Sequence, residues 1–200
     1  MKYLSLALLV LMIACKKPAQ NNNTAPAEAK GTGELKDFVL IDIPGSDAKL
    51  AQKKDMNGLV SEAGIVRKGK KNGQWYSQYP DGRMMAIRQY LDDKVEGWFM
   101  TFDDRGRIVQ QTLYKDNYID GPCKIYKQGS RLIKEAYYSK GKLNGVVKEF
   151  HERGYIQKET NFKMDKIDGK VRFYNDKGEV TLEYEYKDGV KISGPPESIE

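Results

Sequence analysis

The stretch that decides the fold is residues 97–120, which read GWFMTFDDRGRIVQQTLYKDNYID. The run from Trp98 to Phe102 is rich in aromatic residues and Thr, as strands are, and Ile108 to Tyr114 is a second such run. Asp104-Arg105-Gly106 separates the two runs, and Gly supplies the positive φ that a tight turn needs. The stretch therefore predicts one β-hairpin.

This hairpin recurs with a period of 24 residues. Five glycines are spaced 24 apart, at Gly73, Gly97, Gly121, Gly145 and Gly169. Counted from each as offset zero, offset 17 is always aromatic: Tyr90, Tyr114, Tyr138, Phe162 and Tyr186. Offset 11 is always aliphatic or Met: Met84, Ile108, Leu132, Ile156 and Val180. Several fixed columns at once indicate a repeat architecture, in which neighbouring units cover one another.

Alternation along a strand predicts which side chains share a face. Offsets 11 and 17 are expected on one face, because successive strand side chains point to opposite sides. Offset 14, with Gln111 and Glu135, is expected on the other, polar face. In the first strand, offsets 2 and 5 are both often apolar, which indicates either a bulge or burial on both faces. Pairs such as Asn72-Gly73 and Asp120-Gly121 are tight-turn signals and are expected to end the second turn.

The expected fold is all-β: an elongated antiparallel sheet of five ~24-residue hairpins over residues 73–194, with a small α/β cap at 34–72. In the cap, Phe38–Ile43 reads as a strand and Ile65–Arg67 as part of a worn repeat, while residues from Asp47 to Met56 are expected to form a short helix. Pro195 and Pro196 begin a tail at 195–200, because Pro cannot donate to a ladder.

The N-terminal residues predict a targeting signal. An apolar run from Leu4 to Ile13 is too short to span a bilayer but fits the core of a signal peptide at 1–14. Met12-Ile13-Ala14-Cys15 resembles the lipobox of bacterial lipoproteins, with Met12 in place of the usual Leu. That resemblance implies cleavage before Cys15, lipidation of Cys15 and a membrane anchor. Lys16, by resemblance to the sorting rule of enterobacterial lipoproteins, favours the outer membrane.

Residues 15–33 are expected to be the lipidated Cys15 and a tether, because they hold almost no large apolar side chain. The other cysteine of the chain is Cys123, which is expected to be a small buried side chain.

The repeat pattern resembles the MORN repeat variant family. The matching positions are Gly97, Trp98, Phe102, Gly106 and Tyr114, with their counterparts from Gly73 to Gly194. The resemblance implies a binding or scaffold role; related arrays are linked to acidic phospholipids, and many bacterial members are labelled toxin–antitoxin antitoxins. The aromatic residue next but one after the first Gly is replaced in the last three repeats by Cys123, Val147 and Val171.

Charge argues against a nucleic-acid partner. The formal net charge is +6, but Gly73 to Ile192 holds 22 basic and 19 acidic residues and is nearly balanced. A nucleic-acid binder would carry a basic stripe on the body of the fold. The excess lies between Lys49 and Lys71, with seven basic and two acidic residues, a segment that could touch anionic lipid or cell-wall polymer.

No residue group predicts catalysis, and no cofactor or metal is expected. His151 is the single His and lies in a predicted turn, away from Cys123 in the repeat. Acidic pairs such as Asp92-Asp93 and Asp103-Asp104 are ordinary turn residues, although they could bind Ca²⁺ weakly.

The aromatic column Tyr90, Tyr114, Tyr138, Phe162 and Tyr186 is the candidate partner-binding surface, either as a stacking platform for sugars or peptides or, as the pattern favours, as core. The leading hypothesis is an envelope-anchored, non-catalytic binding or scaffold lipoprotein with a protein or glycan partner. The alternative is an immunity or antitoxin-like protein that inhibits a toxin by direct binding.

Overall fold

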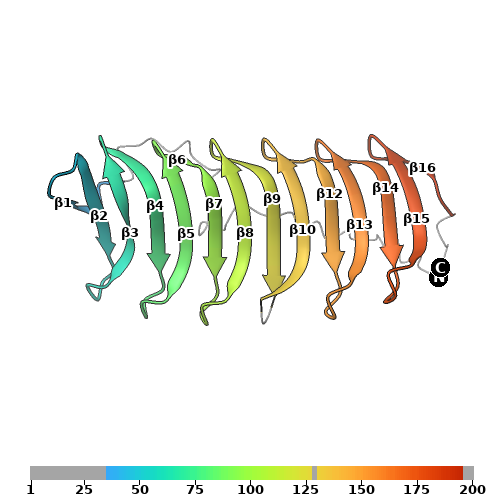
Figure 1. Ribbon diagram of the computed structural model, residues 1–200, viewed down its shortest axis with the longest axis horizontal. Coiled ribbons are helices and arrows are strands. Elements are labelled where there is room, and N and C mark those ends of the chain that lie inside the picture. The colour runs from blue at the N-terminus through green and yellow to red at the C-terminus, as the bar shows by residue number, and fades with distance from the viewer. Residues whose placement is uncertain (1–34, 128–129, 196–200) are drawn as a thin grey trace, which may run out of the picture.

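The structure is a computed structural model that describes residues 35–127 and 130–195. These residues form one open, elongated antiparallel sheet of sixteen strand segments, with no helix among them (Figure 1). The prediction of an all-β sheet of hairpins is confirmed. The predicted signal peptide, Cys15 and the tether lie outside the described residues, as does most of the tail.

The strands follow one another in space in the order of the sequence. Their bounds are β1 Val39–Asp42, β2 Ala48–Lys54, β3 Val60–Arg67, β4 Lys70–Gln78, β5 Met84–Leu91, β6 Lys94–Val95, β7 Gly97–Phe102, β8 Ile108–Lys115, β9 Tyr118–Lys127, β10 Arg131–Ser139, β11 Lys142–Leu143, β12 Gly145–Phe150, β13 Ile156–Lys163, β14 Lys166–Tyr174, β15 Val180–Lys187 and β16 Val190–Ser193. The short β6 and β11 lead directly into β7 and β12.

Five-residue loops close the hairpins of the first, second, fourth and fifth repeats, all at the same end of the strands. In one of them the Asp103 amide donates to the Arg107 carbonyl at 2.9 Å, and the Gly106 amide donates to the Asp103 carbonyl at 3.0 Å. Asp103 Oδ1 also accepts from the amides of Arg105 and Arg107, both at 2.9 Å. Gly106 has φ 75°, which explains why Gly recurs at this offset.

Two-residue turns join neighbouring repeats at the opposite end of the strands. Both residues of each turn have positive φ, as in Asp92 (49°) with Asp93 (70°) and Met164 (50°) with Asp165 (73°). This is the type I′ geometry, whose twist matches that of the strands. The turns therefore lie four to five residues before the predicted position.

The Asn-Gly and Asp-Gly pairs lie in or at the start of strands, not in turns. Gly64 pairs with Trp75 while Ile65 pairs with Asn72, so Gly73 and Gln74 form a bulge in β4. Gly73 has φ 68° there. The turn prediction was wrong because a bulge and a type I′ turn select the same residue types.

A second bulge changes the face on which offset 11 lies. Ser77 pairs with Ala86 but Gln78 pairs with Met84, so Met85 is the extra residue of β5. Paired side chains share a face, which places Met84 on the side opposite Ala86 and Tyr90. The prediction that offsets 11 and 17 share a face was wrong, because alternation does not continue through a bulge.

One face of the sheet, called the inner face here, holds the core. It carries offsets 2, 15 and 17, including the fully buried Trp75, Phe99 and Thr112. The core has two clusters, one around Trp75 and a longer one from Ala86 to Val147. Arg88 lies between Trp75 and Phe99 in the same row, with its guanidinium 5.0 Å from the Phe99 ring centre. The opposite side is the outer face.

The N-terminal part continues the array without a helix. The helix predicted from Asp47 to Met56 was wrong: Ala48–Lys54 is strand β2, which pairs with β1 on one side and β3 on the other. Ala51 and Gly64 occupy offsets 2 and 15 of the repeat, so β2–β3 is a sixth hairpin in register. Backbone pairing on both sides outweighs the local spacing of Ala48, Leu50 and Ala51.

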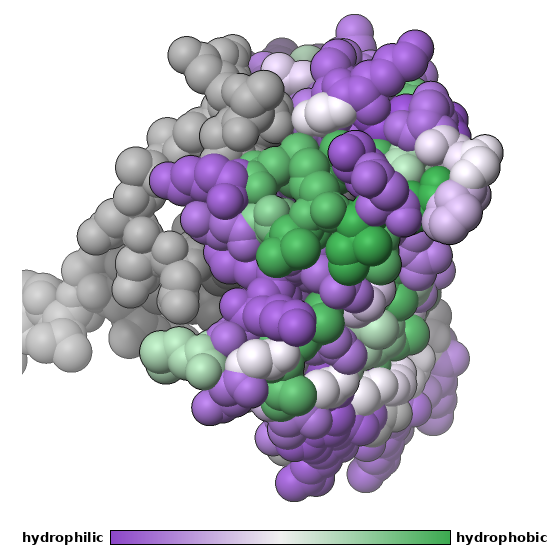
Figure 2. All heavy atoms as spheres, turned by 90° about the vertical axis from the view of Figure 1, so that its left-hand side faces the viewer, coloured by the Kyte–Doolittle hydropathy of each residue, from purple (hydrophilic) through white to green (hydrophobic). Residues whose placement is uncertain are grey.

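The array ends in two edge strands, β1 and β16. Val39, Leu40 and Ile41 in β1 are all exposed. Figure 2 looks onto this end of the sheet and shows apolar side chains gathered between hydrophilic ones.

Candidate binding surface

The predicted aromatic column lies on the inner face. Tyr114 and Tyr138 are buried in the longer core cluster, and Phe162 packs against it. Tyr90 packs edge-on against Trp75, with ring centres 6.0 Å apart. Tyr186 is half-buried beyond both clusters. Burial raises the pKa of Tyr114 to about 12.

A different set of aromatic side chains is exposed. Among the described residues, the most exposed aromatic residues are Trp98 (41%), Tyr118 (57%) and Tyr137 (40%). They come from β7, β9 and β10, which lie close together in the middle of the sheet (Figure 1). The offset-17 column gave no signal for them, because they occupy other offsets.

Two of these rings, those of Trp98 and Tyr137, lie in one row on the outer face. Trp98 pairs with Leu113, and Pro122 pairs with Tyr137. Each is adjacent in its strand to an inner-face residue, so all four point outward. We call this row of Trp98, Leu113, Pro122 and Tyr137, together with Tyr118 on the same face at the turn end of β9, the outer aromatic patch.

Two bulge glycines make room for this patch. A Cβ on Gly121 would lie 2.8 Å from the Leu113 side chain, and a Cβ on Gly145 would lie 3.0 Å from Tyr137 Cβ. Both glycines have positive φ, at 122° and 132°. Their lack of a side chain lets Leu113 and Tyr137 lie close over the sheet, so the patch is backed by strand rather than by a loop.

Balanced ion pairs flank the patch on the same face. Lys124 lies 3.5 Å from Glu135, and Lys148 lies 3.5 Å from Glu159. These two pairs therefore add no net charge to the outer face.

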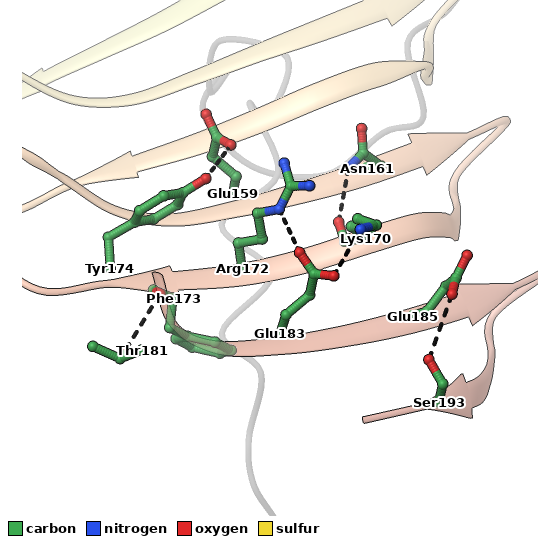
Figure 3. Close-up of polar contacts among 10 residues, drawn as sticks. All are labelled: Glu159, Asn161, Lys170, Arg172, Phe173, Tyr174, Thr181, Glu183, Glu185 and Ser193. Carbon is green, nitrogen blue, oxygen red and sulfur yellow. Dashed lines mark hydrogen bonds and ion pairs between the residues drawn. The ribbon is translucent and has the colours of Figure 1, made fainter. Parts of the chain in front are cut away.

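Polar side chains on the outer face also contact one another toward the C-terminal end of the sheet (Figure 3). Glu183 accepts from Arg172 Nε at 2.7 Å and lies 2.7 Å from Lys170 Nζ, and the hydrogen bond from Arg172, followed by that from Lys170, lowers the Glu183 pKa. Tyr174 Oη donates to Glu159 at 2.7 Å. These contacts pair the polar groups of Arg172, Glu183, Lys170, Tyr174 and Glu159 with one another.

His151 has a structural role in its loop. It occupies the position that Asp103 has in another repeat, and its Nδ1 accepts from the Arg153 amide at 3.2 Å. Its ring stacks on Tyr155 with centres 4.6 Å apart. Cys123 is fully buried on the inner face, with Sγ 3.3 Å from Thr112 Oγ1. The structure does not bring His151 and Cys123 together.

The acidic pairs serve the turns. Asp93 Oδ1 accepts from the Lys71 amide at 2.8 Å. Asp103 accepts from Arg107 Nε at 2.8 Å, and this hydrogen bond lowers the Asp103 pKa to about 2. Within residues 35–127 and 130–195, no three His, Cys, Asp or Glu side chains are grouped as metal ligands.

Several basic residues of the segment from Lys49 to Lys71 form ion pairs with neighbouring carboxylates. Lys49 lies 2.9 Å from Asp42, and Arg67 lies 3.0 Å from Asp47. Lys71 is buried, with Nζ 4.3 Å from the Trp75 ring centre. Sequence reasoning missed this cation–π contact, which needs β4 to place the two side chains together. Across the part of the chain that is described, no helix is long and apolar enough to cross a membrane.

Comparisons with known proteins do not identify the chain. No protein-family model matches it, and neither does any curated protein. A crystal structure of TarM is 15% identical over 52% of this chain and 20% of TarM, with a TM-score of 0.33. A TarM mutant from S. aureus, in complex with Fondaparinux, alpha-GlcNAc-glycerol and UDP, is 11% identical over 81% of this chain and 22% of that protein, with a TM-score of 0.21.

This chain thus spans about a fifth of the length of TarM. At these TM-scores the likeness does not identify the fold or the activity of this chain.

Proposed function

We propose that this chain is a non-catalytic binding module held on the bacterial cell envelope, in the outer membrane, by lipid on Cys15. The observation that carries the binding role is the outer aromatic patch. Exposed aromatic side chains that gather on one face, rather than scatter singly, mark interaction sites. Trp and Tyr supply large contact area with one polar end, which suits a surface that alternates between water and partner.

The extended array supports the same role. Its hairpins stack in a fixed register, so the outer face is long and firmly positioned. The resemblance to MORN repeats favours a scaffold over an enzyme. The lipobox ending in Cys15, followed by the polar stretch to residue 33, favours an anchor with a tether.

Metabolic labelling with radioactive palmitate tests the anchor. The wild-type chain is expected to take up the label and to fractionate with outer membranes, whereas Cys15→Ser loses the label. Cys123→Ser, at the other cysteine of the chain, is the matched control, and its variant is expected to keep the label. Labelling that persists in Cys15→Ser contradicts the anchor.

Crosslinking in intact cells tests the binding role. We expect the wild-type chain to capture one envelope component through the outer aromatic patch, and a Trp98→Ala/Tyr137→Ala variant to lose it. Capture of a toxin-like polypeptide by both wild type and Cys15→Ser would instead favour the immunity role. Turnover of envelope substrates by the purified chain, lost on His151→Ala, would overturn the non-catalytic assignment.

A further inference from the structure

The size of the outer aromatic patch limits what can cover it. Trp98, Tyr118 and Tyr137 are 41%, 57% and 40% exposed. With about 150–250 Å² for a whole aromatic side chain, the three rings offer about 200–350 Å². A stable protein–protein interface needs about 800 Å² from each partner. The rings alone therefore fit a narrow ligand better than a globular protein.

The shape of the patch favours an extended ligand. Trp98 on β7 and Tyr137 on β10 are three strand spacings apart, about 14 Å. Leu113 and Pro122 lie on the two strands between them and continue the apolar surface. A linear ligand that crosses the strands can contact both rings at once.

The chemistry of the outer face favours a glycan over a peptide as its ligand. A peptide laid flat on the face would desolvate backbone amides, and β7 to β10 already use their own backbone groups in pairing with their neighbours. A sugar ring presents an aliphatic C–H face to an aromatic ring and keeps its hydroxyls at the rim, in water. The face therefore suits a glycan.

Charge narrows the ligand further. Two ion pairs on the outer face, Lys124 with Glu135 and Lys148 with Glu159, are balanced. An anionic polymer would gain little attraction from these two lysines, because each of them is already opposed by a carboxylate.

We propose that the outer aromatic patch binds an uncharged, extended glycan chain, whose sugar rings stack on Trp98 and Tyr137. This inference rests on the proposed function and names the partner class of the same surface. Tyr118 borders the site near the tight turn before β9.

Tryptophan fluorescence reads the site directly. The chain has two tryptophans, and Trp75 is only 1% exposed, so acrylamide quenching reports mainly on Trp98. The probes are hexamers of β-1,4-linked glucose and of β-1,4-linked N-acetylglucosamine, added to the full-length chain. We expect at least one hexamer to reduce the quenching constant about twofold.

Variants assign the binding to the patch. Trp98→Ala and Tyr137→Ala are each expected to weaken calorimetric binding about tenfold, which is the size of one stacking contact. Tyr155→Ala, on an edge loop, is the aromatic control and is expected to bind as wild type. Trp98 and Tyr137 are exposed, so unchanged circular dichroism and urea midpoints should show that their variants fold.

Other outcomes overturn the inference. It fails if neither hexamer protects Trp98 at millimolar concentration, or if binding survives both alanine substitutions. It also fails if a protein or an anionic lipid vesicle, rather than a neutral hexamer, binds through the patch. In that last case the proposed binding function stands and only the glycan assignment is lost, so the two failures are distinguishable.

Discussion

Asp93 and Lys71 exchange two hydrogen bonds between neighbouring repeats. The Asp93 amide donates to the Lys71 carbonyl at 3.0 Å, and Asp93 Oδ1 accepts from the Lys71 amide at 2.8 Å. Asn117 and Val95 make the same pair of contacts one repeat later, at 3.1 and 2.7 Å. Each tight turn is thus tied to the turn before it, which holds one edge of the array in register.

Substitutions of Asp165, which pairs with Leu143 in the same way, test this contact. Asp165→Asn is expected to stay within about 0.5 kcal/mol of wild type, because Asn117 already serves this position. Asp165→Ala is expected to lower the free energy of unfolding by about 1–2 kcal/mol, since it loses the side-chain hydrogen bond at a positive φ. Urea unfolding measures both. Equal stability of the two variants would contradict the role of the side chain.

Ser130 is strained in its loop. It has φ 60°, at the offset where other repeats have glycines such as Gly106. Ser130→Gly is expected to raise the free energy of unfolding by about 0.5–1 kcal/mol. The reverse change, Gly106→Ser, is expected to lower it by about 1 kcal/mol, because a Cβ there meets open space and only the backbone is strained. Thermal unfolding should show shifts of opposite sign, and shifts of the same sign would contradict this account.

Gly64 makes space for the indole of Trp75. A Cβ on Gly64 would overlap the Trp75 ring, and the backbone of Gly64 is not left-handed, so the clash is the main effect of adding a methyl group. Gly64→Ala is expected to lower the free energy of unfolding by at least about 2 kcal/mol.

A double-mutant cycle isolates the Gly64–Trp75 contact. Trp75→Leu is expected to cost stability on its own, but Gly64→Ala should cost much less in the Trp75→Leu background. If the two changes were additive, the close approach of Gly64 and Trp75 would not be the cause.

Burial of Tyr114 is expected to make the free energy of unfolding fall at alkaline pH. Burial raises its pKa from 10.0 to about 12. Its contribution is complete below pH 10, where the phenol is neutral in both states. It is lost as the pH rises toward 12, because the unfolded chain releases the proton first. Tyr114→Phe, which copies Phe162, should therefore lose stability less steeply from pH 10 to 12. Parallel pH profiles in urea unfolding would contradict this prediction.

The sequence predicted the sheet of hairpins because its fixed columns report contacts that every repeat shares. It did not predict the faces correctly, because a single extra residue such as Met85 reverses the alternation. Nor could it separate the bulge at Gly73 from the turn at Asp92 and Asp93, since both need positive φ. The helix prediction over β2 was wrong because backbone pairing with β1 and β3 determines the conformation of that segment.

Only part of the outer aromatic patch could have been predicted from the sequence. Trp98 stands at offset 1, where other repeats have Gln74, Pro122, Val146 and Lys170. A search for unusual residues within a column, rather than for shared ones, would have singled out Trp98. Its position in one row with Tyr137 depends on the strand pairing of β7 to β10. A column of residues at one repeat offset carries no information on that pairing.

Co-sedimentation with isolated cell envelopes tests the binding role most directly. The full-length Cys15→Ser chain, which lacks the lipid, is expected to sediment with envelopes through the outer aromatic patch. Adding Trp98→Ala and Tyr137→Ala should reduce the bound fraction at least tenfold, while adding Tyr155→Ala should leave it unchanged. If the chain with both patch substitutions sediments as well as its parent, or if the parent does not sediment, this face is not the binding surface.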